Sequence, residues 1–319
     1  CIVGSGVAGL AAAWALLHHG VKVHIIEQEA EIGSSFRRIA LAEGVEPEAI
    51  DQFIKTVVED RNVVIHTGCK IKAFTERDSD YAVVLDSDGG EEIACGAVLI
   101  GVQPDRYMPG EYGYGKNAGI VTQDELGQRI KAGKIEGRRI VMVQCVGARD
   151  ETNRYCSRFC CRQALQNALR CKAAMGDAEI KVLHKGLRLF GFDEALVGEA
   201  IEQGVELVQI DGKVEISGDS PLKVGASTRN GRIDLEADLV VLSVADTPAK
   251  SNSMVTGLGV EIDDLGFVKS SSDPLNPFVT SIEGVLVCGP ARQPMVAEEA
   301  FIDGLAAACT IVKKLVVGC

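Results

Sequence analysis

The chain has 319 residues, of which 46% are hydrophobic and 24% charged, so it has apolar material for one large or two ordinary globular domains. Its formal net charge is −12 and no stripe of Lys and Arg runs along it, which argues against a nucleic-acid-binding protein. No apolar run reaches the roughly 18–20 residues of a membrane-spanning helix, so no membrane span is expected. Eleven cysteines do not fit a short, disulfide-rich secreted domain. They indicate a reducing, cytoplasmic setting in which some thiols bind metal.

The start of the chain predicts a nucleotide-binding βαβ unit. A buried strand over Cys1–Val3 leads through the turn Gly4–Gly9 into a helix over Leu10–His19, which ends at Gly20, and a second strand covers Val21–Glu27. The pattern then predicts a helix over Glu46–Glu59, a strand over Val63–Thr67, short antiparallel strands over Lys70–Thr75, Tyr81–Leu85 and Glu91–Cys95 with a turn at Asp86–Gly90, and an apolar strand over Ala97–Val102.

A second, similar series of elements follows. It comprises strands over Ile140–Val146, Glu179–His184, Val205–Gln209 and Leu239–Val244, helices over Cys160–Met175 and Asp193–Glu202, and hairpins between Lys213 and Leu235. A strand over Gly284–Gly289 and a last helix over Ala297–Leu315 return to the first domain. We therefore expect an α/β fold of two Rossmann-like, three-layer domains, the second inserted into the first. The split domain would comprise residues 1–110 and 250–319 and the inserted domain residues 111–249, with crossings near Tyr107–Gly119 and Ala245–Ser253.

The turn Gly4-Ser5-Gly6-Val7-Ala8-Gly9 has the dinucleotide-binding pattern G-x-G-x-x-G. It follows a strand, opens a helix, and the next strand ends at Glu27, which is the context that makes this short pattern specific. Gly4 permits the tight turn, Gly6 leaves room for a pyrophosphate, and Gly9 lets helix and strand pack closely. The helix N-terminus offers free N–H groups to phosphate. Glu27 can accept hydrogen bonds from a ribose hydroxyl and disfavours the 2′-phosphate of NADP.

Two features favour FAD over NAD at this turn. The late segment GVLVCGPARQP before the last helix would close a flavin site from the far end of the chain, and a second domain interrupts the first. Arg37 and Arg38, in GSSFRR after the second strand, either contact phosphate or flavin oxygens or lie on a solvated surface.

Four cysteines occupy the βαβ unit of the second domain, where glycines would normally approach a dinucleotide: Cys145, Cys156, Cys160 and Cys161. Their spacing, C-x10-C-x3-C-C, is not that of a zinc finger or ribbon. The adjacent pair would strain to meet one tetrahedral ion but could bind separate irons of a wider cluster, and the N-terminus of the helix that begins at Cys160 favours thiolates. We favour a [4Fe–4S] cluster and leave open a zinc site, a redox disulfide or thiol relay, and a structural role.

Other residues of this region fit the same interpretation. Arg149, Arg154, Arg158 and Arg162 add positive charge near the thiols. Cys171, further along the helix, is expected to pack in the core.

The segment QCVGARDETNRYCSRFCCRQAL resembles the A subunit of heterodisulfide reductase, a flavoprotein family with a thioredoxin-reductase-like core. The fingerprint, the stretch EYGYGKNAGIVTQDEL and the segment GVLVCGPARQP extend the resemblance over most of the chain. It implies non-covalent FAD and a [4Fe–4S] cluster held by Cys145, Cys156, Cys160 and Cys161. The resulting cofactor-binding candidates are Gly4, Ser5, Gly6, Val7, Ala8, Gly9, Glu27, Gln28, Arg37, Arg38, Lys70, Ile71, Gly101, Gly289, Pro290 and Ala297. Pro290 stands where many flavin reductases have the Asp of a Gly-Asp motif.

The chain departs from the methanogen members of this family. It lacks their ferredoxin-like cysteine runs and their cysteine-containing loop after the second strand. This compact form is similar to the A-type proteins of heterodisulfide-reductase-like complexes in sulfur-oxidising microbes. The resemblance implies an electron-transfer subunit in thiol, disulfide or sulfur metabolism, homodimeric, with B- and C-type iron–sulfur proteins as partners and no electron bifurcation by this chain alone.

Two other functions remain open. One is a stand-alone NADH-dependent flavin reductase of disulfides or other acceptors, against which the missing glycine fingerprint of the second domain counts. The other is a non-catalytic scaffold with a zinc site. No acid–base side chain is expected to be catalytic, because the cofactors carry the chemistry.

Overall fold

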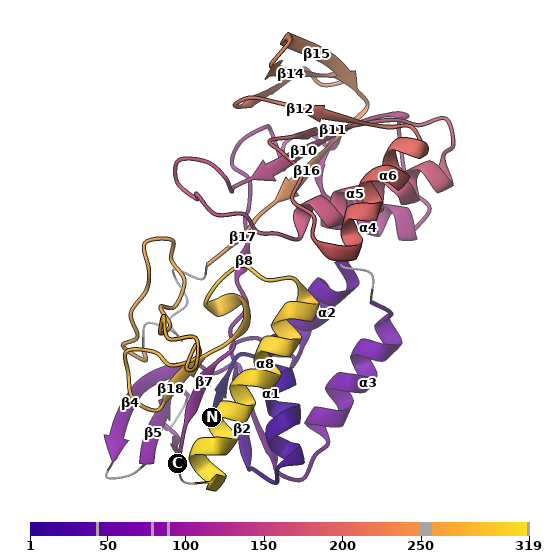
Figure 1. Ribbon diagram of the computed structural model, residues 1–319. Helices are drawn as coiled ribbons and strands as arrows, with labels where there is room; N and C mark the ends of the chain where they lie inside the picture. Colours follow the sequence, from indigo (N-terminus) through magenta and orange to yellow (C-terminus); the bar gives the residue numbers. More distant parts are fainter. Residues whose placement is uncertain (43–44, 78–79, 88–89, 249–256, 318–319) are drawn as a thin grey trace. The chain divides into compact units, whose positions relative to one another are not determined.

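The computed structural model describes residues 1–42, 45–77, 80–87, 90–248 and 257–317 (Figure 1). The chain forms two compact units, one of Cys1–Asp105 with Pro248–Cys319 and one of Arg106–Thr247, called here the split unit and the inserted unit. The first crossing lies before Tyr107, so the segment Tyr107–Gly119 belongs to the inserted unit. Parts of two expected features, the turn at 86–90 and the crossing at 245–253 with its boundary at 249/250, lie outside the described residues.

A five-stranded parallel sheet forms the centre of the split unit, in the order β18-β7-β1-β2-β3. Its strands are β1 (Ile2–Val3), β2 (Val23–Glu27), β3 (Val63–Thr67), β7 (Val98–Ile100) and β18 (Val285–Val287). All neighbours pair in parallel, and Ile2 is the register partner of both Ile25 and Leu99. A strand from late in the chain therefore completes the sheet begun at its start.

Both faces of this sheet are covered, because alternate residues of each strand point to opposite sides. One face carries α1 (Val7–His18), α2 (Ser34–Ala42), α3 (Pro47–Val58) and α8 (Ala297–Val312); the other carries an antiparallel sheet of β4 (Ile71–Arg77), β5 (Asp80–Leu85) and β6 (Glu92–Cys95) (Figure 1). Ile2 packs among the helices, whereas Val3 packs on the antiparallel side. Burial on both sides explains why the strands are continuous apolar runs.

The inserted unit repeats this plan with a parallel sheet in the order β12-β11-β10-β16-β9. Its strands are β9 (Ile120–Thr122), β10 (Arg139–Val146), β11 (Glu179–His184), β12 (Val205–Gln209) and β16 (Leu239–Val244). One face carries α4 (Gln123–Lys131), α5 (Cys160–Ala174) and α6 (Ala195–Glu202), and the other β13 (Val214–Ser217), β14 (Leu222–Thr228) and β15 (Gly231–Ala237). In β10, Met142 faces the helices and Val141 the antiparallel sheet.

Short elements complete the two units. A two-stranded sheet joins β8 (Asp105–Arg106) to β17 (Asp246–Thr247), and the single turns are η1 (Gly191–Glu194), η2 (Gly289–Ala291) and the π-helical η3 (Lys313–Val317). No helix in the described part of the chain combines the length and apolar character needed to cross a bilayer.

The predicted fold class is confirmed, since each parallel sheet lies between a helical layer and an antiparallel sheet and the second unit interrupts the first. The sequence pattern does not predict α2 or α4. Helix α4 begins with a capping box, in which Thr122 Oγ accepts a hydrogen bond from the Glu125 N–H and the Glu125 carboxylate accepts one from the Thr122 N–H. The expected helix Asp193–Glu202 is the turn η1 followed by α6, and the last helix continues beyond α8 as η3.

Helices α1 and α8 approach closely enough that only a glycine fits at one position. A Cβ atom at Gly304 in α8 would overlap the main-chain carbonyl of Ala8 in α1. We expect Gly304→Ala to lower the free energy of unfolding by about 1–3 kcal/mol, because the helices must move apart. The matched control is Gly198→Ala in α6, where a Cβ meets no atom within 4 Å. That change should raise stability by about 0.5–1 kcal/mol. Urea titrations would show the difference, and equal effects would contradict it.

Candidate functional site

The turn after β1 is built from glycines that lie against other backbone segments. Gly4 has a φ of +96°, and a Cβ there would lie 2.8 Å from the Cα of Val102, which follows β7. A Cβ at Gly9 would overlap the carbonyl oxygen of Gly4. The turn can therefore close tightly between β1 and α1 only with glycine at both positions.

The carboxylate of Glu27, at the end of β2, fixes this turn from one side. Its Oε2 accepts hydrogen bonds from the Ser5 N–H at 2.8 Å and the Ser5 hydroxyl at 2.6 Å, and its Oε1 accepts one from the Glu29 N–H at 2.9 Å. The Ser5 Oγ in turn accepts a hydrogen bond from the Gly33 N–H at 2.9 Å. Glu27 is 8% exposed, so these bonds form in a largely water-free environment, where hydrogen bonds to a charged group are strongest.

A pocket of about 590 Å³ opens at this turn. Its lining residues are Gly4, Ser5, Gly6, Glu27, Gln28, Glu29, Ser34, Ser35, Arg38, Lys70, Val102, Gln103, Pro104 and Asp105. The pocket lies at the carboxyl ends of the parallel strands, the usual ligand position in such sheets. It gathers both acidic and basic side chains, as a site for phosphate and ribose would.

The candidate residues from the sequence fall into two groups. Seven line the pocket: Gly4, Ser5, Gly6, Glu27, Gln28, Arg38 and Lys70. The others lie outside its lining: Val7, Ala8, Gly9, Arg37, Ile71, Gly101, Gly289, Pro290 and Ala297. Arg37 is ion-paired with Glu31 and Asp51, and Ile71 is buried in the apolar core. Gly289 donates its N–H to the Asp303 carboxylate at 2.6 Å.

Two observations test whether this pocket fits a dinucleotide. The Gln103 Oε1 is buried beside Gly6 without a hydrogen-bond partner among the described residues, although it lines the pocket. The N-terminus of α1 has Gly6 as its N-cap and no side chain caps it. An orphaned acceptor and open helix N–H groups are what a ligand with hydroxyl and phosphate groups would satisfy. The pocket therefore fits the sugar and pyrophosphate of such a ligand.

The cysteines lie at the equivalent turn of the inserted unit. The register of β10 with β16 shifts between Val143 and Val146, and Cys145, inside this bulge, has a φ of +63°. A left-handed conformation is unusual for a side chain other than Asn, Asp or His and indicates a local constraint. The bulge turns Cys145 out of the strand pattern at the end of β10.

The other three thiols precede or begin α5. Cys160 and Cys161 are the first two residues of the helix, whose N-cap, Phe159, makes no side-chain cap. Cys156 accepts a hydrogen bond from the Arg158 N–H at 3.4 Å, and Arg158 has a φ of +69°. Free N–H groups and the helix dipole at this end favour negatively charged sulfur.

The four thiols lie close enough to perturb one another. The pKa of Cys160 is raised well above its usual value by the hydrogen bond to Cys161, by burial and by the other three sulfurs. The same hydrogen bond lowers the pKa of Cys161 to about 7, helped by the Arg188 N–H. Burial raises the pKa of Cys145, against the influence of Arg149. In contrast, Cys171 is an isolated core thiol whose pKa burial raises to about 11.

Basic residues surround this cysteine cluster. Arg149 lies 3.8 Å from the Cys145 sulfur and donates to the carbonyls of Gly186 at 2.8 Å and Lys185 at 2.6 Å. Arg188 acts on Cys161 through its backbone and its charge. Arg188 lies after β11, so sequence spacing does not associate it with the cysteines. Of the predicted arginines, Arg162 is instead paired with Asp193 at 3.4 Å.

Four cysteine thiols form a donor set that either an iron–sulfur cluster or a zinc ion could use. Within the described residues, no three His, Cys, Asp or Glu side chains are placed to hold one metal ion. A zinc ion would draw four sulfurs to about 2.3 Å from one point. An iron–sulfur cluster would likewise take four cysteine sulfurs as its ligands.

Comparison with known proteins agrees with this description. The fold matches thioredoxin reductase from T. acidophilum with a TM-score of 0.68 and 18% identity over 98% of this chain and 97% of that one. Thioredoxin reductase from Lactococcus lactis matches with a TM-score of 0.65 and 17% identity, over 98% and 97%. Residues 1–132 match the pyridine nucleotide-disulphide oxidoreductase family. The fold and this match define a class by architecture: the chain has a thioredoxin-reductase-like fold, and its first 132 residues match a pyridine nucleotide-disulphide oxidoreductase domain.

Within this class the chain is similar to the A subunit of heterodisulfide reductase. The A subunit of the ferredoxin:CoB-CoM heterodisulfide reductase of Methanosarcina acetivorans is 38% identical over 164 residues, which cover 49% of this chain and 20% of the relative. The A subunit of the H(2):CoB-CoM heterodisulfide,ferredoxin reductase of Methanothermobacter marburgensis is 30% identical over 263 residues, 74% of this chain and 40% of the relative. The chain thus spans less than half the length of these relatives.

The Ser5–Glu27 contact gives a testable expectation. Glu27→Gln keeps the side-chain size but replaces one carboxylate oxygen with an NH₂ group, which would face an N–H donor. We expect the free energy of unfolding to fall by about 1–3 kcal/mol, because a buried donor loses its partner. Glu29→Gln, exposed at the same pocket, should stay within about 0.5 kcal/mol of the parent. Urea unfolding measures both, and equal losses would rule out this anchoring role.

Proposed function

We propose that this chain is an FAD- and [4Fe–4S]-containing electron-transfer subunit of a heterodisulfide-reductase-like complex acting on thiol, disulfide or other sulfur substrates. One observation carries the proposal above the others. The βα turn of the inserted unit holds four mutually interacting thiols in place of the glycines of a dinucleotide site. The similarity to the A subunit of heterodisulfide reductase points the same way.

Cys145, Cys156, Cys160 and Cys161 would be the cluster ligands. The uncapped end of α5, the Arg188 N–H and the Arg149 guanidinium all favour the thiolate form that iron requires. Three of the four sulfurs belong to buried residues and Cys156 is half-buried, so Cys156 is the ligand nearest solvent.

FAD would bind at the pocket of the split unit. Gly4 and Gly6 allow the pyrophosphate to approach the backbone, and the α1 N-terminus faces its charge. The Glu27 carboxylate would accept a hydrogen bond from a ribose hydroxyl and keep its hydrogen bonds from Ser5, since each carboxylate oxygen can accept more than one hydrogen bond. Gln103, Arg38 and Lys70 would supply polar contacts along the pocket.

The two cofactors would supply paired-electron chemistry at the flavin and single-electron transfer at the cluster. The chain's own residues bind and orient these groups and set the charge around them. We expect none of the described pocket or cluster residues to act as a general acid or base.

We infer the cellular compartment and the partner proteins of the chain from its cysteine cluster and from its similarity to heterodisulfide reductase A subunits. Cluster thiolates need a reducing compartment, so we place the protein in the cytoplasm. Its relatives are named as A subunits of heterodisulfide reductases, and we infer that this chain also works with other subunits, B- and C-type iron–sulfur proteins, and as a homodimer.

A stand-alone NADH-dependent reductase is the main rival, because residues 1–132 match a pyridine nucleotide enzyme family. Such an enzyme needs a second nucleotide site in the inserted unit. There, Cys145 lies in the bulge at the end of β10, and the ring of Tyr107 packs against Gly147 in the following turn, where a pyrophosphate would approach. Both features count against NADH binding at this turn.

The first test is the cofactor content of anaerobically purified protein. One FAD with about four iron and four sulfide per chain supports the proposal. Zinc without iron would support the scaffold alternative. FAD without metal, together with steady-state NADH oxidation, would support the reductase.

Removal of one thiol should separate the two cofactors. We expect Cys160→Ser to lose most of the iron while it retains FAD, because Cys160 and the pocket belong to different units. The control is Cys171→Ser on the same helix, a core thiol outside the cluster, which should retain iron. Iron and flavin assays measure both variants. Iron retained in Cys160→Ser would remove this residue from the ligand set.

The reverse change tests the pocket. A Cβ at Gly6 would meet the Gln103 side chain, so Gly6→Val fills the space beside the turn. We expect loss of FAD and retention of iron, since the larger side chain blocks the pyrophosphate. Gly110→Val, where a Cβ meets no atom within 4 Å, is the control and should keep both cofactors. Retained flavin in Gly6→Val would contradict the pocket assignment.

A further inference from the structure

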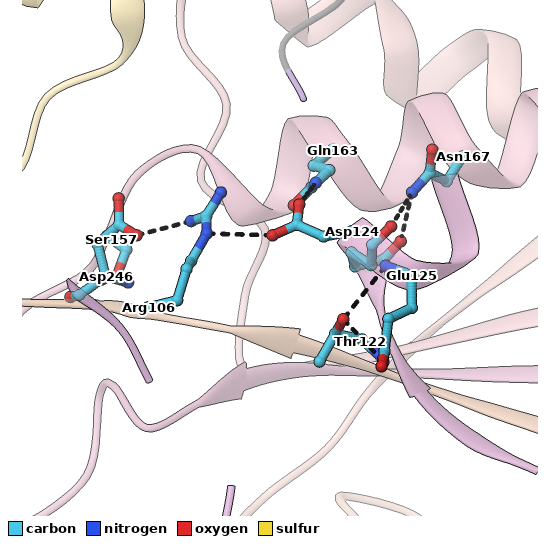
Figure 2. A network of polar contacts seen from close by, with 9 residues as sticks. Arg106, Thr122, Asp124, Glu125, Ser157, Gln163, Asn167 and Asp246 are labelled. Carbon is cyan, nitrogen blue, oxygen red and sulfur yellow. Dashed lines mark hydrogen bonds and ion pairs between the residues drawn. The ribbon is translucent and has the colours of Figure 1, made fainter. Parts of the chain in front are cut away.

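A buried ionic network centred on Arg106 lies in the inserted unit (Figure 2), and it interacts electrostatically with one of the cluster thiols, Cys160. The Arg106 guanidinium pairs with Asp246 at 2.7 Å and with Asp124 at 3.2 Å. It also lies 4.2 Å from the centre of the Phe159 ring and interacts electrostatically with the Cys160 thiol. The Arg106 side chain is 13% exposed, so this charge is held in place rather than solvated.

The network is itself fixed to the elements of the inserted unit. Asp124 lies in the first turn of α4, after the Thr122 cap, where the helix dipole favours a carboxylate. Asn167 of α5 donates to the carbonyl and the side-chain oxygen of Gln123, at 3.0 and 2.9 Å, and so ties α5 to the start of α4 (Figure 2).

Residues that alternate with the cysteines contact this network. Tyr155 and Ser157, on either side of Cys156, both bond to the main chain of Asp246: the Tyr155 hydroxyl donates to its carbonyl at 3.0 Å, and the Asp246 N–H donates to Ser157 Oγ at 3.1 Å. Phe159 stacks under Arg106 immediately before Cys160.

The anchoring continues past the adjacent cysteines Cys160 and Cys161. Gln163, one position beyond Arg162, donates to the Asp124 carboxylate at 2.6 Å. Each of Cys156, Cys160 and Cys161 thus lies between residues held by Arg106, by the main chain of Asp246 or by the Asp124 carboxylate.

We propose that Arg106 is a positioning residue and charge partner for the cysteine cluster: with Asp124 and Asp246 it presets the loop that carries Cys156, Cys160 and Cys161 and offsets their negative charge. The part that concerns charge at a bound cluster rests on the proposed function. The part that concerns loop geometry stands on the contacts alone.

The buried position makes both effects large. Without Arg106, two carboxylates would remain beside the thiols with no cation between them, and removing one member of a buried ion pair is strongly destabilising. Reduction adds negative charge to a cluster, so a fixed cation nearby favours the reduced state and its loss lowers the midpoint potential.

The first experiment uses the metal-free, reduced full chain and iodoacetamide, with alkylation at each cysteine followed by mass spectrometry. Cys160 is buried in the parent and can react only when the loop opens. Arg106→Gln should speed its alkylation by about tenfold or more, the factor that corresponds to 1.4 kcal/mol of easier opening.

Arg139→Gln is the matched control. Arg139 also binds two carboxylates in the inserted unit, Asp238 at 2.7 Å and Glu236 at 2.6 Å, but it lies at the start of β10, whereas Cys145 lies near the end of that strand. It should leave the Cys160 rate unchanged. If Arg106→Gln does not fold, Tyr155→Phe removes only one anchoring hydroxyl and should speed alkylation of Cys156 by a smaller factor. Unchanged rates in the folded Arg106 or Tyr155 variant would overturn the positioning role.

The second experiment measures the midpoint potential of anaerobically reconstituted protein. Arg106→Gln should lower the potential, whereas Arg106→Lys, which keeps the charge but loses the two-pronged geometry, should stay near the parent. A purely structural role predicts no such recovery with lysine. A potential that is the same in all three proteins would overturn the charge role.

The outcomes separate this inference from the proposed function. A parent protein that binds no iron refutes the proposed function, while the alkylation rates still decide the positioning role. A parent that binds iron, with Arg106→Gln matching it in alkylation and potential, refutes this inference and leaves the proposed function standing.

Discussion

Both sites depend on one constraint: the parallel sheets are buried on both faces by apolar residues. Polar side chains and ligands can therefore be accommodated only where the strands end. In the split unit this place is the turn between β1 and α1, and in the inserted unit it is the turn after β10. Helices begin at the same edge, and their free N–H groups point there. The two sites are therefore equivalent positions in two copies of one architecture.

What distinguishes the sites is how each turn is closed. Gly4 reaches its positive φ without steric cost and leaves the neighbouring backbone accessible to a ligand. Cys145 has a similar left-handed conformation despite its side chain, which requires support from its surroundings. That support includes the Gln144 side chain on the preceding residue, which donates to the Ser243 hydroxyl of β16 at 2.7 Å. The first turn is open to a ligand, and the second directs a thiol toward three others.

The sequence was sufficient for the elements whose patterns are local. The strands Val63–Thr67, Glu179–His184 and Leu239–Val244 were predicted to the residue, because each contains β-branched and other apolar residues at strand spacing and has clear ends. The T-x-x-E signal at Thr122 and Glu125 was present but missed, and with it α4. Arg106 could not have been found from spacing, since its partner Asp246 is 140 positions away. Arg188 also reaches Cys161 only because β11 lies beside β10.

Charged groups of the inserted unit act on its cysteine thiols, although the chain as a whole is acidic. The net charge of −12 on the whole chain would by itself oppose the negative charge of four thiolates. The charge close to the thiols is different. Arg149 lies beside the Cys145 sulfur, Arg188 acts on Cys161, and Arg106 interacts with Cys160. Arg106 lies between Asp124 and Asp246, so its cation offsets two carboxylates that would otherwise add negative charge beside the thiols. The Arg106 guanidinium interacts with Cys160, and the carboxylates of Asp124 and Asp246 hold the guanidinium in that position. A buried arrangement of this kind resists salt screening, unlike the exposed ion pairs elsewhere on the chain.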